Sequence, residues 1–260
     1  MPDFGRAAPA ALAAWQTMDE ALTAVEESRQ LPMLVVAVPT AQRAARLGVA
    51  LAELEAHVLP ALGLAIPAGQ QAIAQTLAAV AGQRIAITTG GDHTLYLYRG
   101  PRRWHGDDGV IDDADRRHGT IVSNLPAGSV YTTVLEEKTH GTLYLPTAPH
   151  ATGVRCHFTA GRITGVEAES GGEAFAAWLD GHSGAPRRVS HIGIGLNPHL
   201  HHPIGWTLVD EHIAGALFLA LGENRYMGGE NASSLNHDFA LTGASLAVDG
   251  KVVVQDGKLV

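Results

Sequence analysis

The spacing of hydrophobic positions changes once along the chain. Over the first third, apolar residues recur every three or four positions, which is the spacing of one helix face. This pattern predicts a helix over residues 8–28 and, after an apolar strand over 33–38, helices over 39–62 and about 68–81.

From Arg84 onward, short apolar or alternating segments separated by Gly, Pro and Asp predict strands. Two further helices are expected in this part, over about 172–180 and 210–221. The C-terminal sequence LAVDGKVVVQDGKLV places Asp-Gly pairs between Val runs, and Asp-Gly is a strong hairpin signal. The predicted strands are IAITT, HTLYLYR, TIVSN, SVYTTV, GTLYLP, VRCHF and RITGVEA.

These elements indicate an α+β fold. A helical N-terminal part, residues 1–83, precedes a strand-rich body, residues 84–260, and no internal repeat or low-complexity linker separates them. With 260 residues, 46% hydrophobic and 17% charged, the chain is long enough to bury a substantial core.

Composition limits the partners. A net charge of -8 and the lack of a large Lys/Arg cluster disfavour nucleic acid. Cys156 is the single cysteine, so neither an intrachain disulfide nor a thiolate metal cluster is expected. The sequence shows neither a secretory signal pattern nor an apolar run long enough for a membrane helix. We therefore expect a cytoplasmic protein without a membrane partner.

A series of sequence blocks carries a family resemblance. In order, the blocks are ITTGGDHTLYLYRGPRRWHGDDG, NLPAGSVYTTVLEEKTHGTLYLP, HIGIGLNP, DEHIAGALFLALGENRYMGGEN and NHDF. Together they resemble the aminopeptidase T-like metallopeptidase family, which also contains 2,5-dihydroxypyridine dioxygenase, over roughly residues 84–260. The resemblance implies the family's catalytic fold, a small-molecule substrate and assembly into a homo-oligomer.

The positions that bind metal in the peptidases are mostly changed in this chain. By the resemblance, these positions are occupied by Ser129, His191, Phe218, Asn236 and Asp238. Only the last retains a peptidase ligand, whereas a two-metal site needs several carboxylates to balance two dications. A metal-dependent aminopeptidase-like hydrolase is therefore kept only as an alternative.

The dioxygenase branch of the family is the closer match. It has a His at the place of His191, and two His and one carboxylate hold a single non-heme iron. Asp238 supplies the carboxylate, and Asn236 stands where the second His would be. Side chains alternate along a strand, so His237 would reach the same site only through a bulge. The predicted metal ligands are His191, His237 and Asp238, for Fe(II) or another divalent metal, with a metal-free site as the alternative.

Several other histidines are candidates for proton transfer or metal binding. By resemblance, His93 would handle a proton near the substrate. Other imidazole donors are available among the 14 histidines of the chain. His140 lies in the block that contains Ser129, and His199, His201 and His202 lie in the loop that follows HIGIGLNP.

A hydrolase that uses some of the same residues is an alternative prediction. If Ser129, His191 and Asp238 converge, they form a nucleophile, a base and an orienting carboxylate. No G-x-S-x-G elbow surrounds Ser129, and His191 with Asp238 could also act as an acid/base pair without a serine. A non-catalytic binding protein on the same fold is the remaining alternative. The leading prediction is an enzyme that opens the ring of a small aromatic or N-heterocyclic substrate by a dioxygenase mechanism.

Some polar residues have simpler structural interpretations. Glu136 and Glu137 are expected to be a solvated charge pair, and Asp210 and Glu211 to open a helix, where carboxylates interact with free N–H groups. Asn231 is expected in a backbone turn.

Overall fold

The structure of the protein is a computed structural model that describes residues 31–63 and 66–260, together with scattered positions between 11 and 29. The chain forms two compact units. One comprises Met1–Met33 and Ile111–Val122, and the other comprises Leu34–Val110 and Ser123–Val260. The described positions between 11 and 29 are helical, and the rest of the predicted helix over 8–28 lies outside the described residues.

In the first unit, α5 (Asp113–His118) begins at a capping box. The Asp112 side chain accepts from the backbone N–H groups of Ala114 and Asp115, and the Asp115 side chain accepts from the Asp112 N–H. This reciprocal arrangement satisfies N–H groups that a helix start leaves free.

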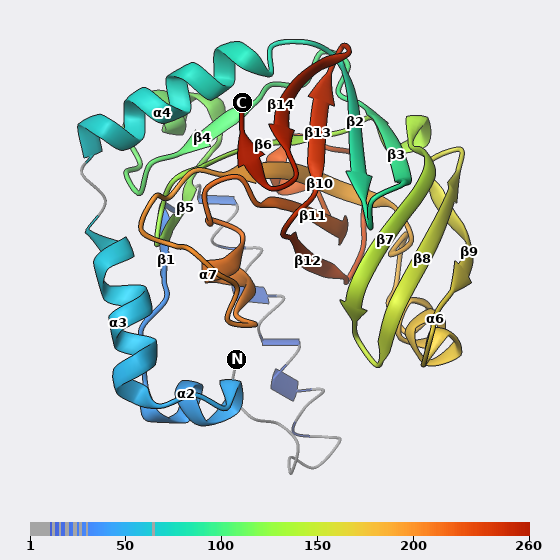
Figure 1. The fold of residues 1–260 in the computed structure, drawn as a ribbon, viewed down its shortest axis with the longest axis horizontal. Helices are drawn as coiled ribbons and strands as arrows, with labels where there is room; N and C mark the ends of the chain where they lie inside the picture. Colours follow the sequence, from blue (N-terminus) through green and yellow to red (C-terminus); the bar gives the residue numbers. More distant parts are fainter. Residues whose placement is uncertain are drawn as a thin grey trace. The chain divides into compact units, whose positions relative to one another are not determined.

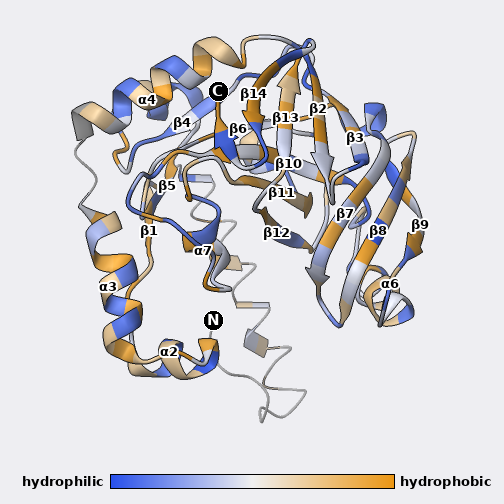
Figure 2. Cartoon of the chain, viewed as in Figure 1, coloured by the Kyte–Doolittle hydropathy of each residue, from blue (hydrophilic) through white to orange (hydrophobic). Residues whose placement is uncertain are grey.

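The second unit contains the N-terminal helices that the sequence predicts. They are α2 (Ala41–Leu47), α3 (Leu51–Leu62) and α4 (Ile66–Ala79), and Figure 2 shows hydrophobic and hydrophilic bands along α3 and α4. The predicted helix over 39–62 is interrupted because Gly48 ends α2 with a φ of 71°, a conformation that glycine adopts without a Cβ penalty. None of the described helices is long and apolar enough to cross a membrane.

Within the described residues, the strands form two large sheets and one small one (Figure 1). The five-stranded sheet has the order β12-β11-β10-β6-β4, the eight-stranded sheet has the order β15-β14-β13-β2-β3-β7-β8-β9, and β1 (Met33–Val36) pairs with β5 (Val122–Leu125). The predicted α+β class is confirmed. The division into residues 1–83 and 84–260 stays a prediction.

The remaining elements of the second unit have the following bounds. Its other helices are α6 (Gly172–Asp180) and the single turn α7 (Thr207–Asp210), with 3₁₀ turns at Glu136–Lys138 and Arg225–Met227. The strands of the five-stranded sheet are β4 (His105–Asp107), β6 (Ser129–Thr133), β10 (Val189–Gly195), β11 (Leu217–Gly222) and β12 (Asn236–Leu241). Those of the eight-stranded sheet are β2 (Arg84–Thr89), β3 (His93–Tyr98), β7 (His140–Ala148), β8 (Ala151–Thr159), β9 (Arg162–Glu167), β13 (Ser245–Val248), β14 (Lys251–Gln255) and β15 (Lys258–Leu259).

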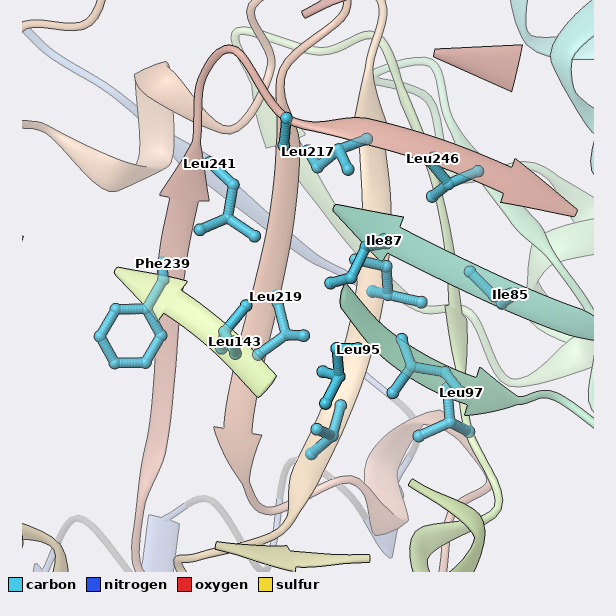
Figure 3. Packing of buried hydrophobic residues seen from close by; sticks show 14 of the residues in the cluster. Ile85, Ile87, Leu95, Leu97, Leu143, Leu217, Leu219, Phe239, Leu241 and Leu246 are labelled. Carbon is cyan, nitrogen blue, oxygen red and sulfur yellow. The ribbon is translucent and has the colours of Figure 1, made fainter. Parts of the chain in front are cut away.

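The main hydrophobic core contains apolar side chains from both large sheets. Figure 3 shows Leu217 and Leu219 of β11 together with Ile87 of β2 and Leu95 of β3 in this cluster. A second cluster joins α2 and α3 to the segment that follows β10, through residues such as Leu54 and Val209. The alternation of each strand therefore fixes which of its side chains enter the main core.

One element differs from its predicted type. The sequence predicts a helix over 210–221, but Leu217–Gly222 is β11, between β10 and β12. All six of its residues are buried. A short apolar run without polar alternation fits a buried strand as well as a helix, so long-range pairing decided the outcome.

The predicted hairpins at the C-terminus are confirmed. Asp249 and Gly250 have φ values of 48° and 85° between β13 and β14, and Asp256 and Gly257 have 47° and 76° between β14 and β15. Two consecutive left-handed residues give a turn whose twist matches that of the flanking strands.

Replacing Leu219 by Ala should lower the free energy of unfolding by about 2–5 kcal/mol, because the side chain is fully buried and its removal leaves a cavity. Val252→Ala is the matched control, since Val252 is 43% exposed and should cost less than about 1 kcal/mol. Urea unfolding of both variants measures this, and similar losses would contradict the assignment of β11 to the core.

Candidate active site on the five-stranded sheet

The two faces of the five-stranded sheet differ in chemistry. Ile192, Leu219 and Phe239 point from β10, β11 and β12 into the hydrophobic core. The alternate positions, including His191 and Asp238, belong to the opposite face. The candidate site is therefore built on a sheet whose other side is anchored in the core.

His191 and Asp238 meet across the strand between them. Asp238 pairs with Ala220 of β11, and the register of β10 against β11 shifts between Val189 and Ile192, which brings His191 opposite the same residue. A bulge of this kind re-aims a side chain. Ala220 is too small to separate its neighbours, so His191 Nε2 lies 2.8 Å from Asp238 Oδ1.

Both members of this pair are shielded from water. The side chains of His191 and Asp238 are 5% and 24% exposed. Burial raises the pKa of Asp238, but the positive charge of His191 in its protonated form outweighs burial and lowers the pKa below its usual range. Asp238 Oδ1 is buried and receives no aligned hydrogen bond, although it lies so close to His191 Nε2.

Phe218 forms an apolar wall beside His191. The two rings meet edge to face with centroids 5.9 Å apart, and Phe218 lies directly against Gly193, where a Cβ would clash with the ring. Phe218 lies on a strand and not on the helix that the sequence predicts. It keeps water away from one side of the His191 imidazole.

A cluster of buried ionisable residues lies near the pair. His212 Nδ1 is 3.6 Å from Glu211 Oε1, and His212 Nε2 is 3.6 Å from Asp107 Oδ2. Burial and the negative charges of Asp238, Asp107 and Asp210 raise the pKa of Glu211 well above its usual range. Glu211 therefore keeps its proton to a higher pH than an exposed glutamate.

This cluster was not found from the sequence. Asp210 and Glu211 do not open a helix: α7 ends at Asp210, and its carboxylate accepts from the N–H groups of Ile204 and Gly205. Asp107 reaches the cluster from β4, about a hundred residues earlier. No local spacing rule connects positions so far apart. The run Asp-Glu-His at 210–212 is the sequence feature that could have indicated a polar cluster here.

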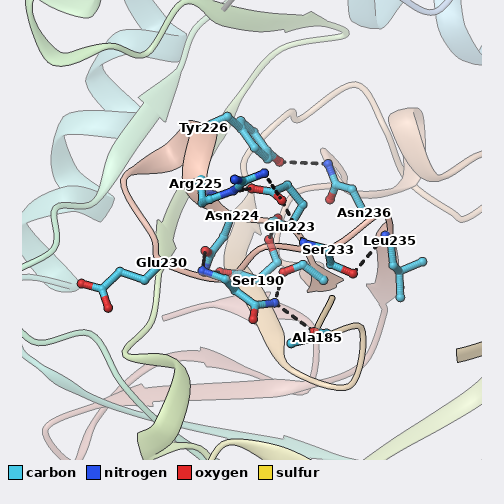
Figure 4. A network of polar contacts seen from close by, with 12 residues as sticks. Ala185, Ser190, Glu223, Asn224, Arg225, Tyr226, Glu230, Ser233, Leu235 and Asn236 are labelled. Atoms are coloured by element: carbon cyan, nitrogen blue, oxygen red, sulfur yellow. Dashed lines mark hydrogen bonds and ion pairs between the residues drawn. The ribbon is translucent and has the colours of Figure 1, made fainter. Parts of the chain in front are cut away.

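A second polar network supports the strand that carries His191. Asn224 Nδ2 donates to the carbonyl of Ser190 at 3.1 Å and to Glu136 Oε1 at 2.8 Å, and Asn231 N–H donates to Asn224 Oδ1 at 2.8 Å. Figure 4 shows Ser190 with Asn224 and Glu223 from the segment that follows β11. Asn231 lies in the loop before β12, outside the turn at Gly228, and its side chain donates to the backbone carbonyls of Ala185 and Gly222.

Glu136 is the charged centre of this network. Arg102 donates to both of its carboxylate oxygens at 2.9 Å, and the Glu230 N–H donates to one of them. Burial alone raises the pKa of Glu136, but these donors outweigh it and lower the pKa to about 2. The prediction that Glu136 is solvated is wrong, because it is 7% exposed and fully paired.

The structure separates the other predicted site residues from the pair. Ser129 pairs with Gly195 and His191 with Thr133, so Ser129 lies four positions along the sheet, about 13 Å away. His237 faces the core side of β12, where its ring packs against Trp178 and Phe239. The bulge lies on β10 and not on β12, so it does not turn His237 toward the site.

His93 lies on β3 of the eight-stranded sheet. Its ring stacks on Tyr144 with centroids 5.7 Å apart, and its Nε2 lies 3.4 Å from Asp92. Among the described residues it makes no direct contact with His191 or Asp238, so its predicted role in proton transfer stays a prediction.

The histidines after β10 surround a different pocket. A cavity of about 430 Å³ is lined by His57 of α3 and by His199, His201 and His202. The rings of His57 and His202 have centroids 4.6 Å apart, and burial together with His202 and His201 lowers the pKa of His57. In the part of the chain that the structure describes, no three His, Cys, Asp or Glu side chains are arranged to hold a metal, here or at His191.

Comparison with models of protein families shows which family the chain belongs to. The family model for 2,5-dihydroxypyridine 5,6-dioxygenase matches residues 71–260. The chain belongs to this family. The predicted enzyme class, a ring-cleaving dioxygenase of the aminopeptidase T-like group, is confirmed by that membership.

Solved structures agree on the fold. The structure of 2,5-dihydroxypyridine dioxygenase from Pseudomonas putida KT2440 is 19% identical, with a TM-score of 0.66, and the match covers 94% of this chain and 75% of that one. Wild-type AmpT from Thermus thermophilus is also 19% identical, with a TM-score of 0.61, and the match covers 81% of this chain and 59% of that one. No curated protein sequence gives a significant match.

Glu136→Gln should change how stability depends on pH. A carboxyl whose pKa is lowered from 4.5 to about 2 stabilises the fold above pH 4.5 and loses that contribution as the pH falls toward 2. Between pH 6 and pH 3 the unmodified protein should therefore lose about 2 kcal/mol more unfolding free energy than the variant. Chemical denaturation at both pH values measures the difference, and equal losses would show that Glu136 is not held ionised by the network.

Proposed function

We propose that the protein opens the ring of a small hydroxylated N-heterocycle or aromatic compound with dioxygen, and that His191 and Asp238 form the reaction centre. The observation that carries this proposal is the 2.8 Å contact between His191 Nε2 and Asp238 Oδ1 on the polar face of the five-stranded sheet. Membership of the 2,5-dihydroxypyridine 5,6-dioxygenase family supplies the reaction class.

The two side chains fit a divalent metal as a partial donor set. An imidazole nitrogen and a carboxylate oxygen are ligands that non-heme Fe(II) takes, and the buried Asp238 Oδ1 has no aligned hydrogen-bond donor of its own. The third protein ligand of the usual set is absent from the described residues. Asn236 shares the Asp238 face of β12, but it is exposed and its amide donates to the Tyr226 hydroxyl.

A divalent iron bound by His191 and Asp238 would supply the redox chemistry with dioxygen. The chain's own residues prepare the surroundings. Phe218 excludes water from one side of His191 and offers an apolar surface to a flat ring. Burial and the negative charge of Asp238 raise the pKa of Glu211, so we assign it as the proton donor of this site.

The absent third ligand favours a second candidate function. His191 with Asp238 can also act as an acid/base pair that removes a proton from a substrate hydroxyl without metal. The Ser129 hydrolase is less well supported, because the register places Ser129 four residues from His191. The dioxygenase and the metal-free acid/base enzyme both use His191 and Asp238. They differ in whether activity requires a metal.

Replacing His191 by Gln or Asp238 by Asn should abolish metal binding and reduce turnover by about 100-fold or more, since each removes one of two donors. His237→Gln is the matched control, because that ring faces the core side of β12 and should leave both properties within about threefold. Metal analysis of tag-free protein, together with oxygen uptake on 2,5-dihydroxypyridine, measures the two properties. Activity that survives chelation but is lost in His191→Gln would support the metal-free candidate, and activity that survives both substitutions would exclude this centre.

Asn236→His should strengthen metal binding. Residue 236 lies two positions before Asp238 on the same face, opposite Gly222, which leaves room for an imidazole. A second His would complete a set of two His and one carboxylate, and we expect the affinity for Mn²⁺ to rise at least tenfold, as read by calorimetric titration. Asn236→Gln controls for loss of the Tyr226 hydrogen bond and should show no gain. An unchanged affinity in Asn236→His would mean that the metal does not lie on this face.

A further inference from the structure

Ser190 occupies the bulge of β10 next to His191 and is completely buried. Its hydroxyl has two partners. Oγ lies 2.6 Å from the carbonyl oxygen of Glu223 and 2.9 Å from His191 Nδ1. The two contacts together decide where the hydrogen atoms lie.

A serine hydroxyl has one hydrogen to donate, and a carbonyl oxygen only accepts. Ser190 therefore donates to the Glu223 carbonyl, and its oxygen accepts from His191 Nδ1. Nδ1 of His191 must carry a hydrogen. In the neutral ring this leaves the lone pair on Nε2, the nitrogen that faces Asp238.

That assignment puts two acceptor atoms 2.8 Å apart, His191 Nε2 and Asp238 Oδ1. Such a contact is unfavourable unless a positive group, a proton or a metal ion, lies between or beside them. Without Ser190, the carboxylate would be the strongest acceptor next to the ring. It would draw the hydrogen to Nε2 and thereby occupy the lone pair that a metal needs.

Ser190 is itself held in place. Asn224 Nδ2 donates to its backbone carbonyl, and the same amide group donates to Glu136, which Arg102 pairs with on both oxygens. Glu223, whose carbonyl accepts from Ser190, is fixed by its backbone N–H donating to Leu235. The charged network that contains Glu136 therefore extends to the imidazole through one hydroxyl.

We propose that Ser190 is a positioning residue that keeps the hydrogen of neutral His191 on Nδ1, so that Nε2 is presented, together with Asp238, to a divalent cation. This inference rests on the proposed function of His191 and Asp238. The Ser190 hydroxyl on the Nδ1 side of the ring then decides whether His191 Nε2 is free to bind a metal with Asp238 or donates a hydrogen bond to Asp238.

The first test reads the tautomer in metal-free protein. Nitrogen-15 NMR, at a pH where the ring is neutral and with His191→Gln to assign the signals, should show Nδ1–H in the unmodified protein and Nε2–H in Ser190→Ala. Ser190→Thr keeps a hydroxyl and should restore Nδ1–H. Thr132→Val removes a buried hydroxyl on the neighbouring strand that donates to the Arg103 carbonyl, and it should change nothing at His191. Nε2–H in the unmodified protein, or Nδ1–H retained in Ser190→Ala, overturns the proposal.

The second test is titration of the same proteins with Mn²⁺ alone. Loss of the hydroxyl should weaken binding about 10- to 100-fold in Ser190→Ala, with recovery in Ser190→Thr and no change in Thr132→Val. Equal affinities in Ser190→Ala and the unmodified protein overturn the inference. If the unmodified protein binds no Mn²⁺, the metal-bound form of the proposed function fails, whereas the tautomer measurement still decides whether Ser190 positions the ring.

Discussion

The alternation of side chains along β10, β11 and β12 is the constraint on which the site depends. Because Ile192, Leu219 and Phe239 are committed to the hydrophobic core, their neighbours must face the other side of the sheet. A slip of one residue in any of these strands would exchange the two sets. The energy of the core thus fixes the position of His191 and Asp238, although neither residue contributes apolar packing itself.

The site also holds several ionisable side chains away from water. Asp238, Glu211 and Asp107 bring several carboxyl groups into one water-poor region, and ionising all of them would be costly. The structure distributes the charge unequally: protonated His191 favours the ionised form of Asp238, whereas burial and the neighbouring carboxylates favour the protonated form of Glu211. The site therefore favours an ionised Asp238 beside a protonated Glu211.

Family membership and local geometry contribute different information. The match over residues 71–260 establishes the family, and the solved structures establish the fold. The described side chains, however, offer a divalent metal only two converging donors, and Phe218 and Asn236 occupy positions that the resemblance assigns to ligands. The second polar network, from Arg102 through Glu136 and Asn224, is directed to the strand that carries one of those two donors.

The sequence by itself determined the features that depend on local pattern. The Asp-Gly hairpins, α6 and most strands after Arg84 follow from turn chemistry and period, and His191 with Asp238 were recognisable from the ordered blocks. Tertiary structure alone decided that Leu217–Gly222 is a strand, because an apolar run of six residues takes the form that its neighbours can pair with. It also decided the bulge at His191, the burial of Glu136 and the convergence of Asp107 with Glu211 and His212, since each depends on contacts between residues far apart in the chain.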